Sequence, residues 1–485
     1  MKKGEIKESL GFIVLPFLFV LILLPNSLRG WFGLADDHHF IEAYDSAQGN
    51  LQGIFDYFFQ LQPWGDTTRF NPSQLLAWSL ETTLFGDKAI LWRTLQLIAV
   101  FTAVYAIGRS TYLGLSLFLP NFPRKRVLAI SFQGIFLSLP FLGESIARIG
   151  NPETFAATTL SLLILFHLKQ FQNSNSLKYS WLIALLNIIL VGFKENLFPL
   201  GLISLLLQVL YLLRCDSIKG RISQIAPLLF QLFYFVFFIM AFVPTLLGQG
   251  QDIYGNEIGI NRFSIGKWII LPTASLFLFV LNIIKRRDSL LGLLLQIVCV
   301  FLVFLDYFIM GGKLSGHYGF VTGFVLMCQL LFFLAATDFL GKNLLYFLIP
   351  AISIGITTNG IFTMEYLNST RVFKNEISEL RQKIASGEGS DVVIIIRSLD
   401  EYEAVSSTTS FARSPKTKFY LKNEREFEEN ILSNHLRDAE TAGNKIWHIL
   451  PSSSRKITTS CIEVYFSKSE IKKTCDQSVF VSWLK

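Results

Sequence analysis

The chain has 485 residues, of which 51% are hydrophobic and only 16% charged, and its formal net charge is +7. Soluble domains carry about 25% charged residues, so this composition excludes an ordinary soluble protein. Apolar runs recur along the chain, mostly about 17 to 25 residues long, which is the length that a helix needs to cross the hydrocarbon core of a bilayer. The sequence therefore predicts a polytopic α-helical membrane protein.

Eleven membrane-spanning helices are expected from these runs. The first run is not followed by a small-residue cleavage pattern, so we expect a retained helix and not a removed signal peptide. The expected spans lie near residues 11–28, 90–117, 127–142, 154–168, 181–193, 197–213, 225–247, 269–284, 290–309, 317–336 and 344–361.

Basic residues are far denser in alternate loops, which include the clusters Arg124-Lys125-Arg126 and Lys285-Arg286-Arg287. Positive charge stays on the cytoplasmic side of a membrane. This pattern places the amino terminus inside and, through the odd number of spans, the carboxyl-terminal part outside a cytoplasmic (inner) membrane, on its periplasmic or extracellular face. The net positive charge reflects this topology and does not indicate a nucleic-acid partner.

The first external loop, residues 29–89, is much longer than the connections of a compact bundle, which is typical of a functional loop. The stretch FIEAYDSAQGNLQGIFDYFFQ is compatible with a helix broken near Gly49. In NPSQLLAWSLETTLFG, Asn71 suits an N-cap, Pro72 the first helical position and Gly86 the end, and a stripe of leucines is typical of a helix in the membrane interface. We expect two short helices that roof the bundle.

The composition changes abruptly after residue 362, from apolar runs to a mixed polar sequence. We therefore expect a transmembrane domain over residues 1–362 and a small external α/β domain over 363–485. Cys461 and Cys475 lie in this external part, where a disulfide and two free thiols are equally expected. The expected elements are strands at 391–397, 445–450 and 461–466 and an amphipathic helix at 425–439.

Asp36 and Asp37 directly follow the first apolar run and are the strongest catalytic candidates. A carboxylate at the mouth of a bundle, partly shielded from water, can act as a general base; the alternative is a solvated helix end. His38 and His39 come next, but adjacent helical residues point about 100° apart, so all four groups cannot converge on one ion. A divalent ion such as Mg²⁺ or Mn²⁺, held by Asp37 with groups from elsewhere, stays open.

Lys194 and Glu195 interrupt what is otherwise one apolar stretch from 181 to 213. Ionisable residues at such depth usually face the bundle interior or a water-filled cavity. Lys194 is thus a candidate phosphate binder, and the alternative is a tight turn between two spans. Other candidate ligand contacts lie at the same outer face, where structural ion pairs or packing are the alternatives: Arg69, Arg148, Glu153, His317 and Tyr318.

No nucleotide-binding loop or Ser-His-Asp order occurs in the sequence. Chemistry on the outer face has no access to ATP or nucleotide sugars, so an enzyme there needs an activated donor held by the membrane, such as a polyprenyl-phosphate-linked sugar. The lipid phosphate that leaves requires positive charge near the surface, which Arg69, Arg148, Lys194 and Arg262 can supply.

In order and sidedness, these motifs resemble those of the polytopic GT-C glycosyltransferases, including the protein O-mannosyltransferases and the aminoarabinose transferases. The similarity covers about residues 1 to 362. It implies an outward active site beneath the loop helices, with Asp36 as catalytic base, Asp37 in support or as a metal ligand, and Lys194 on the donor phosphate. The motifs that carry the resemblance are GLADDHHFIEAY, RFNPSQLLAWSLETTLFG with Arg93, RIGNPE, the KE of GFKEN, and His317-Tyr318.

The expected function is therefore a membrane glycosyltransferase, a hexosyl- or pentosyltransferase, whose acceptor is a glycan, a lipid or a protein. A polymerase or ligase of lipid-linked oligosaccharides would share the donor and differ in the acceptor. A transporter or flippase of lipid-linked or small solutes is the other alternative. It predicts charges near the middle of the membrane and related halves, and neither is clear in the sequence.

Overall fold

A computed structural model defines the fold over most of the membrane part and over the strands of the carboxyl-terminal part. It describes residues 11–33, 37–61, 71–122, 124–172, 177–214, 218–246, 250–251, 257–258, 269–285, 290–309, 319–336, 342–385, 391–396, 411–412, 418–423, 446–452, 461–466 and 470–472.

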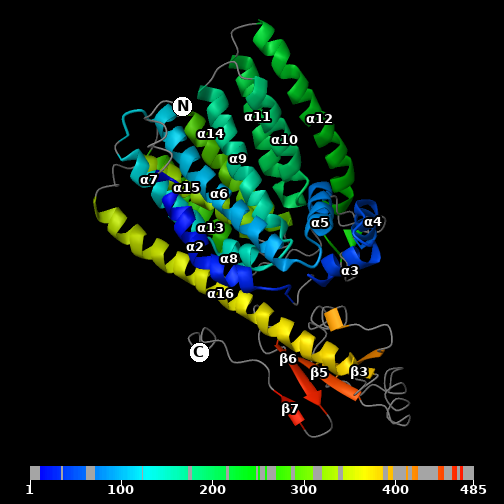
Figure 1. Ribbon diagram of the computed structural model, residues 1–485. Helices are drawn as coiled ribbons and strands as arrows, with labels where there is room; N and C mark the ends of the chain where they lie inside the picture. Colours follow the sequence, from blue (N-terminus) through cyan, green and yellow to red (C-terminus); the bar gives the residue numbers. More distant parts are fainter. Residues whose placement is uncertain are drawn as a thin grey trace.

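Helices occur at all eleven positions where the apolar runs predict spans, and they pack side by side as a bundle (Figure 1). The predicted span at 127–142 is two helices, which meet at an angle of 59°. Leu139, before Pro140, is extended, because the proline ring disfavours the helical conformation for the residue that precedes it. The helices are α2 (Val14–Arg29), α6 (Ala89–Phe118), α7 (Lys125–Leu137), α8 (Pro140–Ala147), α9 (Pro152–Gln172), α10 (Leu177–Val191), α11 (Phe198–Arg214), α12 (Ile218–Leu246), α13 (Ile270–Lys285), α14 (Leu290–Ile309), α15 (Phe320–Ala336) and α16 (Lys342–Ala385).

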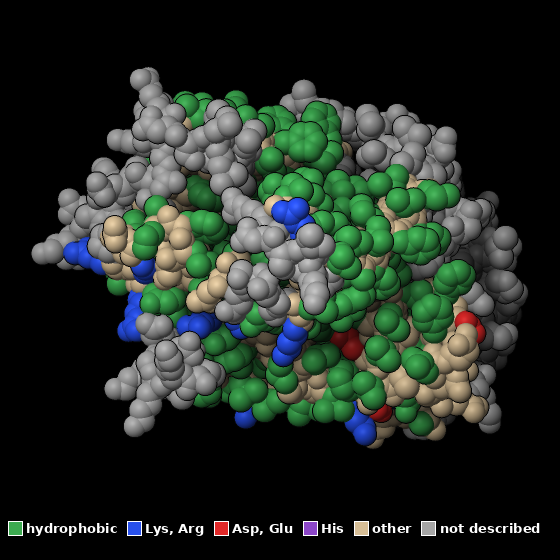
Figure 2. All heavy atoms as spheres, turned by 90° about the horizontal axis from the view of Figure 1, so that it is seen from above, with side chains coloured by type: hydrophobic (Ala, Val, Ile, Leu, Met, Phe, Trp, Pro, Cys, Tyr) green, Lys and Arg blue, Asp and Glu red, His purple; other side chains and the backbone are tan. Residues whose placement is uncertain are grey.

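The surface of the bundle is apolar, as contact with lipid requires. Among the described residues, α6 and α9 are long and apolar enough to cross a membrane, and α7 with α8 adds a third span if the bent pair is counted as one. Seven further apolar helical stretches are shorter. Large side chains such as Phe233 and Met240 are more than 70% exposed, and hydrophobic side chains cover much of the face shown in Figure 2. The chain is a helical membrane protein, and a crossing by each of the eleven helices stays a prediction.

Helix α6 lies at the centre of the bundle, where it packs against α2, α7 and α9. Its buried face is rich in small residues, including Ala99, Ala103 and Gly108, which let neighbouring helices approach closely. At Gly108 an added Cβ would clash with the side chain of Gln133. The Gln133 amide instead donates a hydrogen bond to the carbonyl of Val104 on α6, at 3.0 Å.

The described part of the loop at residues 29–89 contains three short helices and not the predicted two: α3 (His38–Ser46), α4 (Leu51–Leu61) and α5 (Pro72–Phe85). Two consecutive residues with positive φ, Gln48 and Gly49, end the first helix completely instead of merely bending it. Phe40, on α3, packs against Trp78 of α5 with ring centroids 5.7 Å apart. The Trp78 indole N–H donates to the carbonyl of Gly150 at 2.6 Å, which fixes this roof on the segment before α9.

Helix α16 continues for 44 residues and passes through residue 362, where the composition changes. A five-stranded sheet follows in the order β4-β3-β5-β6-β7, with β3 parallel to β4 and β5 and the other pairs antiparallel. The three predicted strands are confirmed, whereas β4 and β7 were not predicted. The predicted helix at 425–439 and Cys475, with the disulfide proposed for it, lie outside the described residues. The strands are β1 (Gly250–Gln251), β2 (Glu257–Ile258), β3 (Asp391–Ile396), β4 (Lys418–Asn423), β5 (Ile446–Ser452), β6 (Cys461–Phe466) and β7 (Glu470–Lys472).

Candidate active site

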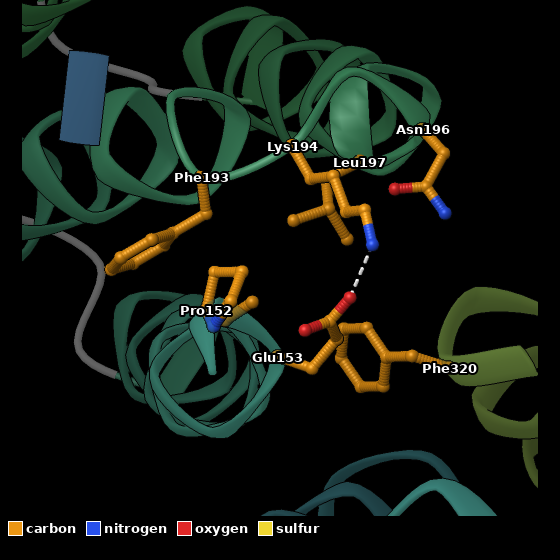
Figure 3. Close-up of a pocket in the computed structure, with 8 residues that line it drawn as sticks. Pro152, Glu153, Phe193, Lys194, Asn196, Leu197 and Phe320 are labelled. Atoms are coloured by element: carbon orange, nitrogen blue, oxygen red, sulfur yellow. Dashed lines mark hydrogen bonds and ion pairs between the residues drawn. The ribbon is translucent and has the colours of Figure 1, made fainter. Parts of the chain in front are cut away.

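An ion pair between Lys194 and Glu153 marks one end of the bundle (Figure 3). Glu153 lies in the first turn of α9 after Pro152, where the positive end of the helix dipole favours a carboxylate. Lys194 lies in the connection between α10 and the 3₁₀ turn η1 (Glu195–Leu197). The side chains are 18% and 3% exposed, respectively. Both residues were predicted as ligand contacts, and the fold brings them together.

A second carboxylate, that of Asp306 on α14, lies near this pair and is buried. It accepts hydrogen bonds from the Asn196 amide at 3.0 Å and from the backbone N–H and hydroxyl of Thr322 at 3.1 and 2.7 Å. Lys194 is close enough to Asp306 to interact with it electrostatically. A buried carboxylate requires such partners. The cluster thus joins the ends of α9, η1, α14 and α15 around one cation.

The space around the Lys194–Glu153 pair is too narrow to admit a water molecule. Its lining residues are Pro152, Glu153, Ala156, Phe193, Lys194, Asn196, Leu197 and Phe320. Two oxygens in it, Glu153 Oε2 and Asn196 Oδ1, are buried and have no hydrogen-bond partner within the described part of the chain. An anion that binds Lys194 therefore has to compete with Glu153, and the two oxygens can accept hydrogen bonds from hydroxyl groups.

Asp37 lies in a different polar cluster, where the chain turns from α2 into α3. Its Oδ2 accepts a hydrogen bond from the backbone N–H of Gly33 at 2.6 Å. The buried guanidinium of Arg93 interacts with it electrostatically and donates to the carbonyls of Trp31, at 2.8 Å, and Ala147. Asp37 is thus held inside the protein by these partners.

Tyr366, on α16, completes this second cluster and was not predicted. Its hydroxyl is buried and has no hydrogen-bond partner among the residues that the structure describes. Burial, and then the nearby Asp37 carboxylate, raise the pKa of Tyr366 well above its usual value. The hydroxyl therefore stays protonated and can donate a hydrogen bond.

Arg148 belongs to the Asp37 side of the site and not to Lys194. It forms an ion pair with Glu144 at 3.6 Å, and each side chain is about a quarter exposed. Both interact electrostatically with Tyr366. The structural ion pair considered as an alternative for Arg148 is therefore present.

The remaining predicted residues are placed only partly. The backbone of Glu195 lies in η1. Asp36, the predicted base, lies outside the described residues. So do four other candidates: Arg69, Arg262, His317 and Tyr318.

One group in the described part of the chain can hold a metal ion: His38, His39 and Glu42, whose ligand atoms all lie within 4.8 Å of one another. Asp37 is not part of it. The helical angle between adjacent residues does not separate the two histidines, because their ring centroids are 3.9 Å apart. Tyr57 donates a hydrogen bond to Glu42 at 2.7 Å and approaches His39 at 3.4 Å. The group lies directly after the predicted catalytic pair in the sequence.

No family model matches the chain, and no curated protein matches it. Among solved structures, it is similar to ArnT from Cupriavidus metallidurans, bound to undecaprenyl phosphate (10% identity, TM-score 0.49, 92% of this chain and 94% of that chain) and in the apo state (11%, 0.47, with the same coverage). It is also similar to an oligosaccharyltransferase from Archaeoglobus fulgidus in complex with Zn and sulfate (12%, 0.42, 91% and 68%). Both proteins are GT-C glycosyltransferases, the group that the sequence motifs resemble.

Proposed function

We propose that this chain is a membrane glycosyltransferase that moves a sugar from a polyprenyl-phosphate-linked donor to an acceptor on the outer face of the membrane. The observation that carries the proposal is the Lys194–Glu153 ion pair with Asp306 beside it. Ionisable groups that are buried within an apolar bundle are costly and are usually retained for a ligand or for chemistry. A lysine is a suitable point charge for a lipid phosphate.

In this proposal the donor phosphate displaces Glu153 from Lys194. The oxygen of Glu153 that has no partner, Oε2, then accepts a hydrogen bond from a sugar hydroxyl. Positive charge at the phosphate stabilises the negative charge that develops on the leaving group. Lys194 thus binds the donor and also assists the departure of the lipid phosphate.

The transfer itself is a substitution at the anomeric carbon. The acceptor oxygen forms a bond to this carbon, the bond to the phosphate oxygen breaks, and the lipid phosphate leaves with the electron pair. The acceptor proton goes to Asp36, which the family resemblance makes the general base. Asp37 is proposed as the residue that positions the base, since Gly33 and Arg93 hold its carboxylate.

The orientation in this proposal has the amino terminus inside and residues 29–89 and 363–485 outside the cytoplasmic membrane. The acceptor remains a glycan, a lipid or a protein. A polymerase or ligase of lipid-linked oligosaccharides would use the same site, with a glycan as its acceptor.

The test is transfer of a labelled sugar from a polyprenyl-phosphate donor in membranes that contain Lys194→Ala, Lys194→Arg or Asp36→Asn. We expect Lys194→Ala and Asp36→Asn to lower transfer at least about 100-fold, the scale of lost charge stabilisation or general base catalysis. Lys194→Arg keeps the charge and should retain part of the activity. Lys178→Ala, at an exposed site on α10, is the matched control. Full activity of Lys194→Ala would overturn the phosphate site, and full activity of Asp36→Asn would overturn the assigned base.

A further inference from the structure

A second pocket, of about 480 Å³, opens where α2 ends, α6 begins and α16 passes. It shares no lining residue with the space around Lys194 and Glu153. Its lining residues are Leu28, Arg29, Gly30, Trp31, Asp87, Lys88, Ala89, Ile90, Arg371, Lys374 and Asn375.

Four cations face one acid in this pocket: Arg29, Lys88, Arg371 and Lys374 against Asp87. Within the described part of the chain, none of the four forms an ion pair. By the predicted orientation they lie on the outer side of the membrane, where positive charge is normally sparse. Cations gathered from three separate helices against this tendency indicate an anionic ligand.

The apolar part of the pocket indicates that this ligand is a lipid. Leu28 and Ile90 line the pocket and are 42% and 44% exposed. Below them, α2 carries further exposed side chains, including Leu21 and Ile22, which continue the apolar surface into the bundle region. Trp31 lies at the junction, as tryptophan commonly does at the membrane interface.

We propose that this pocket binds the phosphate-bearing headgroup of an anionic membrane lipid, with the acyl chains along α2. The inference is independent of the proposed transferase reaction. It also places the lipid near the Asp37 cluster, because the backbone of Trp31 donates to Thr370 of α16 at 2.9 Å and accepts from Arg93 at 2.8 Å.

The experiment uses the purified full chain in phosphatidylcholine nanodiscs. Brominated phosphatidylglycerol quenches tryptophan that lies beside it, and the contribution of Trp31 is the difference between the wild type and Trp31→Phe. We expect phosphatidylglycerol to quench Trp31 at about tenfold lower mole fraction than brominated phosphatidylcholine. The double variant Arg371→Gln/Lys374→Gln should remove this preference, and Lys178→Gln should keep it.

The comparison of the two lipids needs only the wild type and Trp31→Phe, so it decides the proposal even if Arg371→Gln/Lys374→Gln fails to fold. Equal quenching by both lipids, or a preference that survives Arg371→Gln/Lys374→Gln in a folded protein, would overturn it. Glycerol phosphate is added as a competitor. If a low concentration of glycerol phosphate abolishes the quenching by brominated phosphatidylglycerol, the site recognises a free phosphorylated solute. The assignment to a lipid is then wrong.

Discussion

Breaking the Lys194–Glu153 ion pair from either side should have unequal costs, because the two partners differ in burial. Lys194→Ala leaves the Glu153 carboxylate, 3% exposed, without its cation, and also removes the positive charge that interacts with Asp306. Removing one partner of a buried pair costs about 3–5 kcal/mol, since an uncompensated charge remains. Glu153→Gln leaves Lys194, which is 18% exposed and can turn toward water, so we expect about 1–3 kcal/mol.

The double variant Lys194→Ala/Glu153→Gln has neither charge. Its loss of free energy of unfolding should therefore be smaller than the sum of the losses in the two single variants. We expect a coupling energy of about 1–3 kcal/mol, as is usual for residues in direct contact. The assay is equilibrium unfolding of all four proteins in mixed SDS–detergent micelles. Glu144→Gln is the matched control, because its pair with Arg148 is about a quarter exposed and should cost less than about 1 kcal/mol.

The same variants separate stability from ligand binding. Glu153→Gln removes the competitor for Lys194, so polyprenyl phosphate should bind this variant at least as tightly as the wild type, whereas Lys194→Ala should bind it more weakly. Strictly additive free energies of unfolding, or weaker phosphate binding by Glu153→Gln in a folded protein, would refute this account of the pair.

Two further predictions concern the roof. Burial raises the pKa of Glu81 on α5 from its ordinary 4.5 to about 8. As the pH rises, the unfolded chain therefore loses this proton before the folded chain does, and the free energy of unfolding falls by up to about 4 kcal/mol between pH 4.5 and 8. In Glu81→Gln the melting temperature should depend less on pH over this range. Parallel curves of melting temperature against pH for the variant and the wild type would contradict the assignment. Gly150 has φ +69° and faces the Phe40 ring. Gly150→Ala should therefore cost about 1–3 kcal/mol, measured in the same micelles, and an unchanged stability would show that this turn tolerates a side chain.

The positions of the helices follow from the sequence because burial in lipid leaves a strong local signal. Each apolar run is helical, with a break before Pro140 in one of them, and the positive φ of Gln48 and Gly49 explains where the first loop helix ends. The predicted number of roof helices was wrong, because the sequence indicates a break near Gly49 but not the angle between the two parts of the chain that it joins. Strands β4 and β7 were missed, since KFYLKN carries charges and EIK is only three residues long.

Some residues of the candidate site could be predicted from the sequence, but their pairing could not. Lys194 and Glu153 could be identified as charges at the ends of apolar runs, but they meet only because the fold places the start of α9 beside the start of η1. Asp306 depends on Asn196 and Thr322, from distant elements. The sequence did contain an indication of Asp306, because an acidic residue inside an apolar run such as that of α14 is rare. Tyr366 gave no signal, because a tyrosine at a helix surface is ordinary.

Helix α16 also determines how far the carboxyl-terminal sheet can reach. At 1.5 Å per residue, 44 residues extend about 66 Å, roughly twice the thickness of a hydrocarbon core. Only five residues separate its end from β3, a connection that spans roughly 20 Å at most. In the proposed orientation, the length of this helix sets the height of the sheet above the bilayer and restricts the size of any molecule that fits beneath it.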